Sequence, residues 1–149
     1  MERNQFKIAI AANCECVWQV LWNDDTYTQW TGVFGEGSHA RTDWKKGSKV
    51  LFLGSNSAGM VSRIEDLIPN EYMAFEHLGE VKDMVEDFTS DSAKQWAGAR
   101  ENYTLKNVNG NTELTVEIDL APAYASYFKD TFPKGLAKVK ELAEGTNAA

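Results

Sequence analysis

Residues 99–120 read ARENYTLKNVNGNTELTVEIDL, two runs of alternating apolar and polar residues on either side of Asn109-Gly110. An Asn-Gly pair predicts a tight β-hairpin, because both central residues of a type I′ turn take positive φ angles. Side chains alternate along a strand, so a pairing of Val108 with Asn111 puts three pairs on one side of the sheet: Leu105 with Leu114, Tyr103 with Val116, and Glu101 with Ile118. The pairs on the other side are polar, which is consistent with this register.

The run at residues 72–78 predicts a strand that lies beside this hairpin. If the pairing of the hairpin is extended back to this strand, Phe75 lies opposite Tyr103, Met73 opposite Leu105, and His77 opposite Glu101. The long connection does not fix this second register. The predicted sheet face is apolar along most of its length and polar at the end where His77 and Glu101 lie. This pair is interpreted either as one satisfied hydrogen-bonded pair or as a functional acid and imidazole.

Before these strands, the sequence predicts a strand at Phe6–Ile10 and two short helices. Asn13 is the expected N-cap of the first helix, which ends at Trp22, and Asp24 or Asp25 is the expected cap of the second. Further strands are expected at 39–42, 49–53 and 60–68. Residues 79–98 predict a loop, either a solvated excursion with one short helix or a substrate lid. Four of the five tryptophans are interpreted as core or inter-helix packing: Trp18, Trp22, Trp30 and Trp44.

The end of the chain predicts a long helix from Pro122, with apolar residues at helical spacing: Tyr124, Tyr127, Phe128, Thr131, Phe132, Leu136, Val139 and Leu142. Pro133 is expected to kink this helix or restart it with Thr131 as cap, and Gly145 to end it. A twisted sheet closed by one long helix leaves a wedge that forms an apolar pocket. The alternative is that large side chains fill the wedge.

Composition and charge restrict the function further. The 149 residues form one expected domain, with 15 Lys+Arg against 22 Asp+Glu and a formal net charge of −7. A sequence pI near 4.8 argues against nucleic-acid binding. No run approaches the roughly 20 apolar residues of a membrane span, and no secretory signal is visible, so a cytoplasmic location is expected. Cys14, Cys16, His39 and His77 have no zinc-site spacing, and we expect no metal and no cofactor.

Four segments carry a family resemblance: residues 16–24 (CVWQVLWND), 27–30 (YTQW), 59–75 (GMVSRIEDLIPNEYMAF) and 136–142 (LAKVKEL). With the order of elements, the chain resembles the START-like (SRPBCC) superfamily of helix-grip proteins. Within it the chain resembles the AHSA-like branch, named after the C-terminal domain of the heat-shock protein 90 ATPase activators. The resemblance implies an α+β fold in which a curved antiparallel sheet of about seven strands wraps a long C-terminal helix, with two short helices after the first strand.

Members of this superfamily bind lipids, sterols, polyketides or hormones, and some are cyclases or hydrolases. The resemblance carries no fixed catalytic residues to this sequence. The chaperone link belongs to proteins with a further N-terminal domain. We expect no such domain here, because the first strand begins near Phe6, and chaperone activation is therefore disfavoured.

The sequence thus predicts that the protein binds a small hydrophobic or amphipathic molecule between the sheet and the C-terminal helix. The expected site residues are Met73, Phe75, His77, Glu101, Tyr103, Leu105, Val116, Ile118, Tyr124, Phe128 and Phe132. A second hypothesis is an enzyme that uses His77 and Glu101 as its polar pair, and it ranks below binding because no substrate is indicated. A third is a chaperone-associated interaction module or a homodimer, with Phe88 and Trp96 on an exposed patch.

Overall fold

The computed structural model describes the backbone of residues 1–148 and the side chains of residues 1–145. The elements follow in this order: β1 (Glu2–Ile10), α1 (Cys14–Trp22), α2 (Asp24–Thr31), η1 (Gly32–Phe34), β2 (His39–Arg41), β3 (Lys49–Leu53), β4 (Gly59–Ile68), β5 (Tyr72–Lys82), β6 (Val85–Asp87), α3 (Asp91–Lys94), β7 (Arg100–Val108), β8 (Asn111–Leu120) and α4 (Pro122–Ala148). This order confirms the predicted α+β helix-grip fold.

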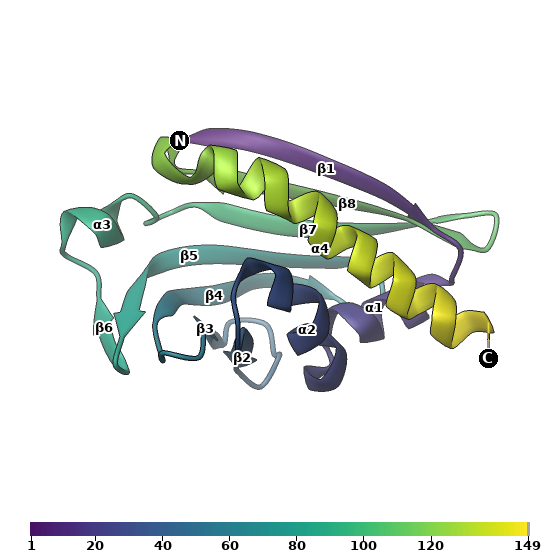
Figure 1. Ribbon diagram of the computed structural model, residues 1–149, viewed down its shortest axis with the longest axis horizontal. Helices are drawn as coiled ribbons and strands as arrows, with labels where there is room; N and C mark the ends of the chain where they lie inside the picture. Colours follow the sequence, from purple (N-terminus) through teal and green to yellow (C-terminus); the bar gives the residue numbers. More distant parts are fainter. Residues whose placement is uncertain (149) are drawn as a thin grey trace.

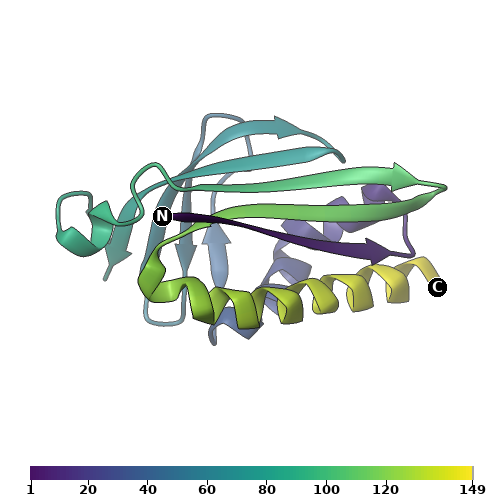
Figure 2. The ribbon, with the colours of Figure 1, turned by 90° about the horizontal axis from the view of Figure 1, so that it is seen from above.

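One antiparallel sheet holds all the described strands in the order β1-β8-β7-β5-β4-β3-β2, and β6 pairs with the far end of β5. Helix α4 runs diagonally across one face of the sheet, and α1 and α2 lie on the same face (Figures 1 and 2). The N-terminus lies near the start of α4, where Lys129 Nζ is 2.8 Å from the Glu2 carboxylate. The main hydrophobic core lies between the sheet and these three helices.

The β7–β8 hairpin has the predicted register. Val108 pairs with Asn111 and Tyr103 with Val116, and Asn109 and Gly110 both have positive φ angles, 55° and 86°. The predicted register of β5 against β7 was wrong by two residues. Met73 lies opposite Tyr103 and Phe75 lies opposite Glu101. Because a shift of two residues preserves the face, all these side chains still point toward the helices.

Residues 79–98 are not the loop that the sequence predicted. Strand β5 continues to Lys82, and the chain turns back at Asp83 and Met84 into β6. Both turn residues have positive φ angles, 51° and 64°, although neither is a glycine or an asparagine. The turn therefore carries no glycine signal in the sequence, and the sheet has eight strands rather than about seven. The expected short helix in this stretch is present as α3.

Two irregularities bend the pairing of β4 with β5. Leu78 is an extra residue on β5 between the pairs Val61–Gly79 and Ser62–His77. Glu65 is an extra residue on β4 between the pairs Ile64–Phe75 and Asp66–Ala74. A β-bulge bends its strand and increases the local twist. The first bulge also places Ser62 directly opposite His77, which is important for the site described below.

The helices differ from prediction mainly at their ends. Asn13 caps α1 as expected, with its side-chain Oδ1 2.8 Å from the backbone nitrogen of Cys16. Asn23, not Asp24 or Asp25, occupies the N-cap of α2. Helix α4 is continuous through Pro133 and Gly145, so the expected restart at Thr131 and stop at Gly145 were wrong. Pro133 has no backbone N–H, so the carbonyl of Lys129, four residues earlier, has no helical hydrogen-bond donor. Both residues lie on the exposed side of α4, where water can donate to that carbonyl.

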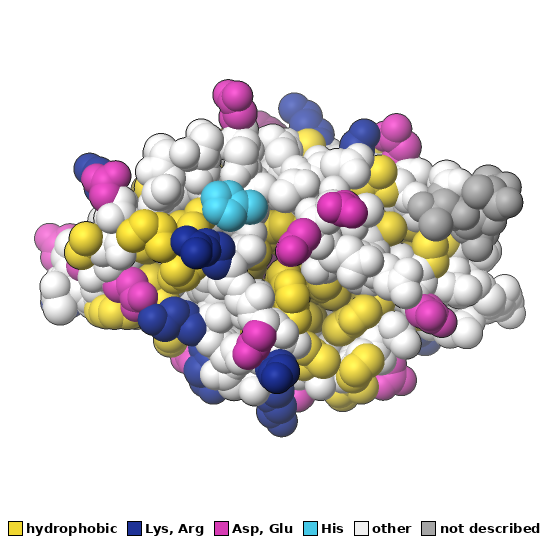
Figure 3. Space-filling view, turned by 90° about the horizontal axis from the view of Figure 1, so that it is seen from below, with side chains coloured by type: hydrophobic (Ala, Val, Ile, Leu, Met, Phe, Trp, Pro, Cys, Tyr) yellow, Lys and Arg dark blue, Asp and Glu magenta, His cyan; other side chains and the backbone are white. Residues whose placement is uncertain are grey.

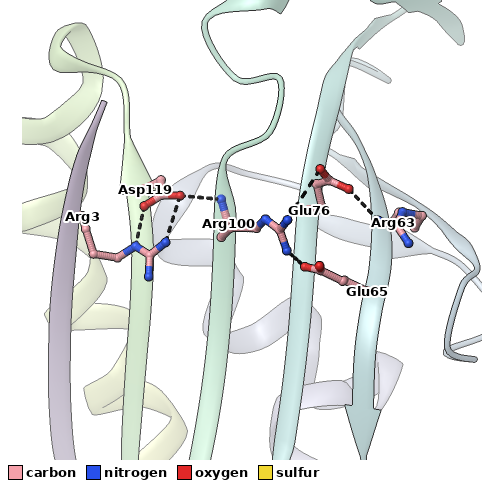
Figure 4. Close-up of polar contacts among 6 residues, drawn as sticks. All are labelled: Arg3, Arg63, Glu65, Glu76, Arg100 and Asp119. Carbon is pink, nitrogen blue, oxygen red and sulfur yellow. Dashed lines mark hydrogen bonds and ion pairs between the residues drawn. The ribbon is translucent and has the colours of Figure 1, made fainter.

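The face of the sheet that carries no helix holds a row of ion pairs across five strands (Figure 4). Arg3 on β1 pairs with Asp119 on β8, whose carboxylate also accepts the backbone N–H of Arg100 on β7 at 2.9 Å. Arg100 pairs in turn with two carboxylates on the neighbouring strands, Glu65 and Glu76, and Arg63 Nη2 lies 2.6 Å from Glu76. Among residues 1–148, no helix is long and apolar enough to cross a membrane.

Candidate functional site

A cavity of about 150 Å³ lies between the sheet, α2 and α4. Its walls come from most parts of the chain: Trp22 of α1; Tyr27, Trp30 and Thr31 of α2; Phe34 of η1; Ser38; Phe52 of β3; Met60 of β4; Phe75 and His77 of β5; Glu101 and Tyr103 of β7; and Phe128 and Phe132 of α4. The cavity therefore depends on the assembled fold rather than on any one segment.

Some of the sequence-predicted residues line this cavity and others do not. Those on its walls are Phe75, His77, Glu101, Tyr103, Phe128 and Phe132. Four others, Met73, Leu105, Val116 and Ile118, are buried in the hydrophobic core away from the cavity. Tyr124 is exposed and its ring packs against Trp96, with the ring centroids 5.3 Å apart.

Sequence reasoning missed the rings that α1, α2, η1 and β3 contribute to the cavity. Trp22 and Trp30, interpreted as packing residues, are core residues and also wall residues. Tyr27, Phe34 and Phe52 were not identified at all. The sequences of the short helices show which residues are apolar. Tertiary packing decides which part of the core each of these side chains faces. For the rings on α1, α2 and η1, no local signal in the sequence would have found them. Phe52 lies on the predicted strand at 49–53, where alternation along the strand could have placed it on the core face with Val50.

The aromatic walls form one connected set of ring contacts. The ring centroids of Trp22 and Tyr103 are 4.9 Å apart, and those of Phe52 and Phe75 are 5.1 Å apart, both with edge-on geometry. On the α4 side, Phe34 lies 5.1 Å from Phe132. Edge-to-face pairs of this kind are favourable beyond the area they bury. The walls are thus held in fixed orientations by their neighbours.

The polar end of the cavity is a chain of hydrogen bonds through four side chains. Ser62 Oγ lies 2.6 Å from His77 Nδ1, and His77 Nε2 lies 3.1 Å from Glu101 Oε1. The hydroxyl of Tyr103 donates to Glu101 Oε2 at 2.5 Å. Ser62 and His77 are 0% and 3% exposed, whereas the Glu101 side chain is 18% exposed. Glu101 is therefore the member of the chain that is most open to a ligand.

The acceptor Glu101 fixes the direction of these bonds. A carboxylate only accepts hydrogen bonds, so His77 Nε2 carries the proton that lies between the two groups. In the neutral ring Nδ1 is then an acceptor, and the Ser62 hydroxyl donates to it. The backbone of His77 is also held, because its N–H donates to Ala99 O at 2.8 Å and its carbonyl accepts from Gly98 N at 2.9 Å.

Two tyrosines beside Glu101 are held in the protonated form. Burial, and then the negative charge of Glu101, raise the pKa of Tyr103 well above its usual value, and the hydrogen bond to Glu101 acts in the same direction. Burial raises the pKa of Tyr27 far above its usual value too, with a further contribution from Glu101. Both phenols are hydrogen-bond donors over the whole neutral range.

The described residues hold no cluster of metal-ligating side chains. Cys14 and Cys16 are free thiols outside the cavity, and burial raises the pKa of Cys16. The chemistry available to the cavity is thus one carboxylate, one imidazole and two phenols within a wall of aromatic rings.

Several solved structures share this fold at low sequence identity. The solution structure of the Aha1 dimer from Colwellia psychrerythraea is 18% identical, with a TM-score of 0.73, and the match covers 97% of each chain. A protein from Mesorhizobium loti is 13% identical with a TM-score of 0.74, over 97% of this chain and 98% of that chain. The AHSA1-like protein from Aeromonas hydrophila is 13% identical with a TM-score of 0.68, over 99% and 96%.

No curated protein matches the sequence significantly. The family described as "Activator of Hsp90 ATPase homolog 1-like protein" matches residues 11–147, which include every wall of the cavity. The match extends from the end of β1 to the end of α4, in agreement with the AHSA-like resemblance seen in the sequence. On this ground the chain belongs to the Activator of Hsp90 ATPase homolog 1-like family.

Proposed function

We propose that the protein binds a small apolar or amphipathic molecule in the cavity between the sheet, α2 and α4. The observation that supports this proposal is the cavity itself, about 150 Å³ with mainly aromatic walls and one polar end at Glu101 and His77. Apolar cavities of about this size bind single-ring guests such as benzene. The proposed ligand is therefore about one ring in size, with a polar group that reaches Glu101.

The burial of such a ligand supplies enough free energy for specific but modest binding. An aromatic ring buries roughly 200 Å² of surface, and at about 25 cal/mol per Å² this corresponds to about 5 kcal/mol. A dissociation constant of a few tenths of a millimolar follows. A hydrogen bond to Glu101 would strengthen the binding further, because hydrogen bonds to charged acceptors are stronger than those to neutral acceptors.

Binding is tested with benzyl alcohol as probe, followed by the fluorescence of Trp22 and Trp30 in the cavity wall and by calorimetry. Saturable binding at one site supports the proposal. Ser38→Trp places an indole at the half-buried edge of the cavity and is expected to weaken binding at least tenfold. Ser126→Trp, the same change on the exposed side of α4, is the matched control. The absence of saturable binding by single-ring compounds would count against the proposal.

Catalysis ranks second, and the observation in its favour is the chain from Ser62 through His77 to Glu101. A nucleophile, a base and an orienting carboxylate are linked in this way in hydrolases. Ser62, however, is 0% exposed and does not line the cavity, so a substrate there cannot reach its hydroxyl. If His77 acts as an acid or base on a bound molecule, His77→Ala will abolish turnover while Ser62→Ala retains it.

A second copy of this chain is the proposed protein partner. One similar solved structure is described as a dimer. Here the projecting β5–β6 turn and the residues after it expose large apolar side chains: Met84 46%, Val85 68% and Phe88 46%. Figure 3 shows hydrophobic side chains gathered at this end of the molecule. Light scattering tests the oligomeric state. Val85→Asp is expected to dissociate a dimer, and Lys106→Asp, a charge change on the exposed surface of β7 away from this turn, is the control. A wild-type monomer at high concentration would exclude a stable dimer.

A further inference from the structure

We propose that the ligand is a small organic cation, an amine or quaternary ammonium attached to about one ring or an equally compact apolar group. The inference deepens the proposed function and rests on it. It is drawn from two features of the same cavity that occur together: a carboxylate at its polar end and aromatic rings around the rest.

The first step concerns charge. Besides the indole N–H groups of Trp22 and Trp30, the polar side chains on the cavity wall are Tyr27, Thr31, Ser38, His77, Glu101 and Tyr103, and none of the wall residues is a lysine or an arginine. The Trp22 N–H is buried without a hydrogen-bond partner among the described residues, so a ligand that also carries an acceptor could satisfy it. Other carboxylates of the sheet, such as Glu76 and Asp119, are paired with arginines on the opposite face (Figure 4). Glu101 instead contacts His77 and Tyr103. The basic side chain beside Glu101 is His77, with its Nε2 3.1 Å from the carboxylate, and no lysine or arginine of the cavity wall pairs with this carboxylate.

The second step concerns the free lone pairs of Glu101. A carboxylate offers about four acceptor sites. His77 Nε2 uses one on Oε1, and the Tyr103 hydroxyl uses one on Oε2. The remaining sites are available to a donor in the cavity, since Glu101 lines it and is partly exposed. A protonated amine has N–H donors and no acceptor, so it matches these sites, whereas a carboxylate or phosphate on a ligand would be repelled. A quaternary ammonium has no N–H and would be attracted only by the charge of the carboxylate and by the rings.

The third step concerns the rings. The face of an aromatic ring is negative and attracts a cation, most strongly for tryptophan. Trp22, Trp30 and Tyr103 line the cavity together, with the rings of Trp22 and Trp30 4.9 Å and 6.3 Å from that of Tyr103. Because Tyr103 also donates to Glu101, the ring cluster and the carboxylate lie side by side. Clusters of aromatic rings bind quaternary ammonium groups in other proteins.

The test compares single-ring ligands of nearly equal size and different charge: benzylamine, benzyl alcohol and benzoate. Binding is measured by calorimetry at neutral pH and about 0.15 M salt, where distant surface charges are screened. Benzylammonium is expected to bind at least tenfold more tightly than benzyl alcohol, and benzoate most weakly. A second pair, choline and its neutral analogue 3,3-dimethylbutan-1-ol, should give the same order.

Glu101→Gln then removes the charge at nearly constant shape. The amide can accept from Tyr103 and donate to His77 Nε2, while His77 Nδ1 donates to Ser62, so the hydrogen-bond chain persists with its direction reversed. The variant is expected to bind benzylamine and benzyl alcohol equally. Glu113 lies on β8, on the face of the sheet opposite to that of Glu101. Glu113→Gln should therefore keep the tenfold preference for benzylamine over benzyl alcohol.

The two proposals fail in different ways. If benzyl alcohol binds as tightly as benzylammonium to the wild type, the cation inference is wrong and the proposed binding function stands. If no member of either series binds, the proposed function itself is wrong. A preference for benzylammonium that Glu113→Gln loses as fully as Glu101→Gln would assign the effect to net charge and would also overturn the inference.

Discussion

Single residues near the cavity control how the protein responds to alkaline pH. The pKa values of Tyr27 and Tyr103 are raised in the folded state, chiefly by burial and then by Glu101. A group whose pKa is higher in the folded than in the unfolded state contributes stability below the unfolded pKa, about 10 for tyrosine. That stability is lost as the pH rises toward the folded value. These two phenols therefore contribute to the loss of stability at alkaline pH.

We expect the free energy of unfolding to be unaffected by these tyrosines up to about pH 10 and to fall above it by about 1.4 kcal/mol per pH unit for each of them. Tyr27→Phe or Tyr103→Phe should each remove one such contribution from the slope, measured by urea unfolding at a series of pH values. Tyr124→Phe, on an exposed ring, is the control. Equal slopes for all four proteins would show that neither buried phenol stays protonated in the folded state.

On the opposite face of the sheet, Asp119 controls the response to acid. Burial raises the pKa of Asp119, but the Arg3 guanidinium and the backbone N–H of Arg100 lower it by more, so the pKa in the folded protein is below the usual value. A depressed pKa contributes stability above the unfolded value, about 3.9, and this stability is lost as the pH falls through the folded value.

Asp119→Asn should therefore reduce the free energy of unfolding by about 1 kcal/mol at pH 7, a small effect because Arg3 is half exposed and water screens the pair. The difference from the wild type should shrink as the pH falls below about 4. Chemical denaturation at pH 7 and at a pH below 4 measures this difference in the free energy of unfolding. Asp130→Asn, on the exposed side of α4, is the control. A difference that stays constant down to pH 2 would contradict the assignment.

At the scale of elements, the sequence predicted what local chemistry determines. The β7–β8 register follows from Asn109-Gly110, and the start of α1 follows from Asn13. The β5–β7 register failed because β6 and α3 lie in the connection between the two strands, so no tight turn fixes their pairing. The continuation of α4 past Pro133 depends on packing of Phe132 and Leu136 in the core, which outweighs the local preference of proline.

The contact between β3 and β4 is an element-scale feature that depends on one glycine. A Cβ atom on Gly59 would lie 1.7 Å from the carbonyl oxygen of Phe52, so the β3 backbone would have to move. Gly59→Ala is expected to lower the free energy of unfolding by about 2 kcal/mol or more. It should also weaken ligand binding, because the neighbours Phe52 and Met60 line the cavity.

Chemical denaturation and the benzyl alcohol titration measure these two effects. Gly32→Ala is the matched control, since nothing lies within 4 Å of its added Cβ and its φ of −55° suits alanine. A stable Gly59→Ala protein with unchanged affinity would show that β3 and β4 can separate freely at this point.

At the scale of the whole molecule, the site is less predictable than the fold. The strand residues Phe75, His77, Glu101 and Tyr103 could be assigned to one face because alternation along strands is a local rule. The rings of Trp22, Tyr27 and Phe34 reach the same cavity only after α1, α2 and η1 pack under α4. How much of the wedge stays open depends on the packing of all these side chains together, which no segment encodes alone.

Because the cavity joins α1, α2, α4 and the sheet, a ligand there should stabilise the molecule as a whole. At a concentration of 100 times its dissociation constant, a ligand that binds only the folded state adds about 2.7 kcal/mol to the free energy of unfolding. For a chain of 149 residues this corresponds to a rise in Tm of roughly 5–10 °C.

Benzylamine at that excess should produce this rise, measured by calorimetry, in the wild type and in Ser126→Trp. At the same concentration Ser38→Trp should show at most about half of this rise, because binding that is tenfold weaker adds only about 1.4 kcal/mol. An equal rise in all three proteins would place the ligand outside the cavity.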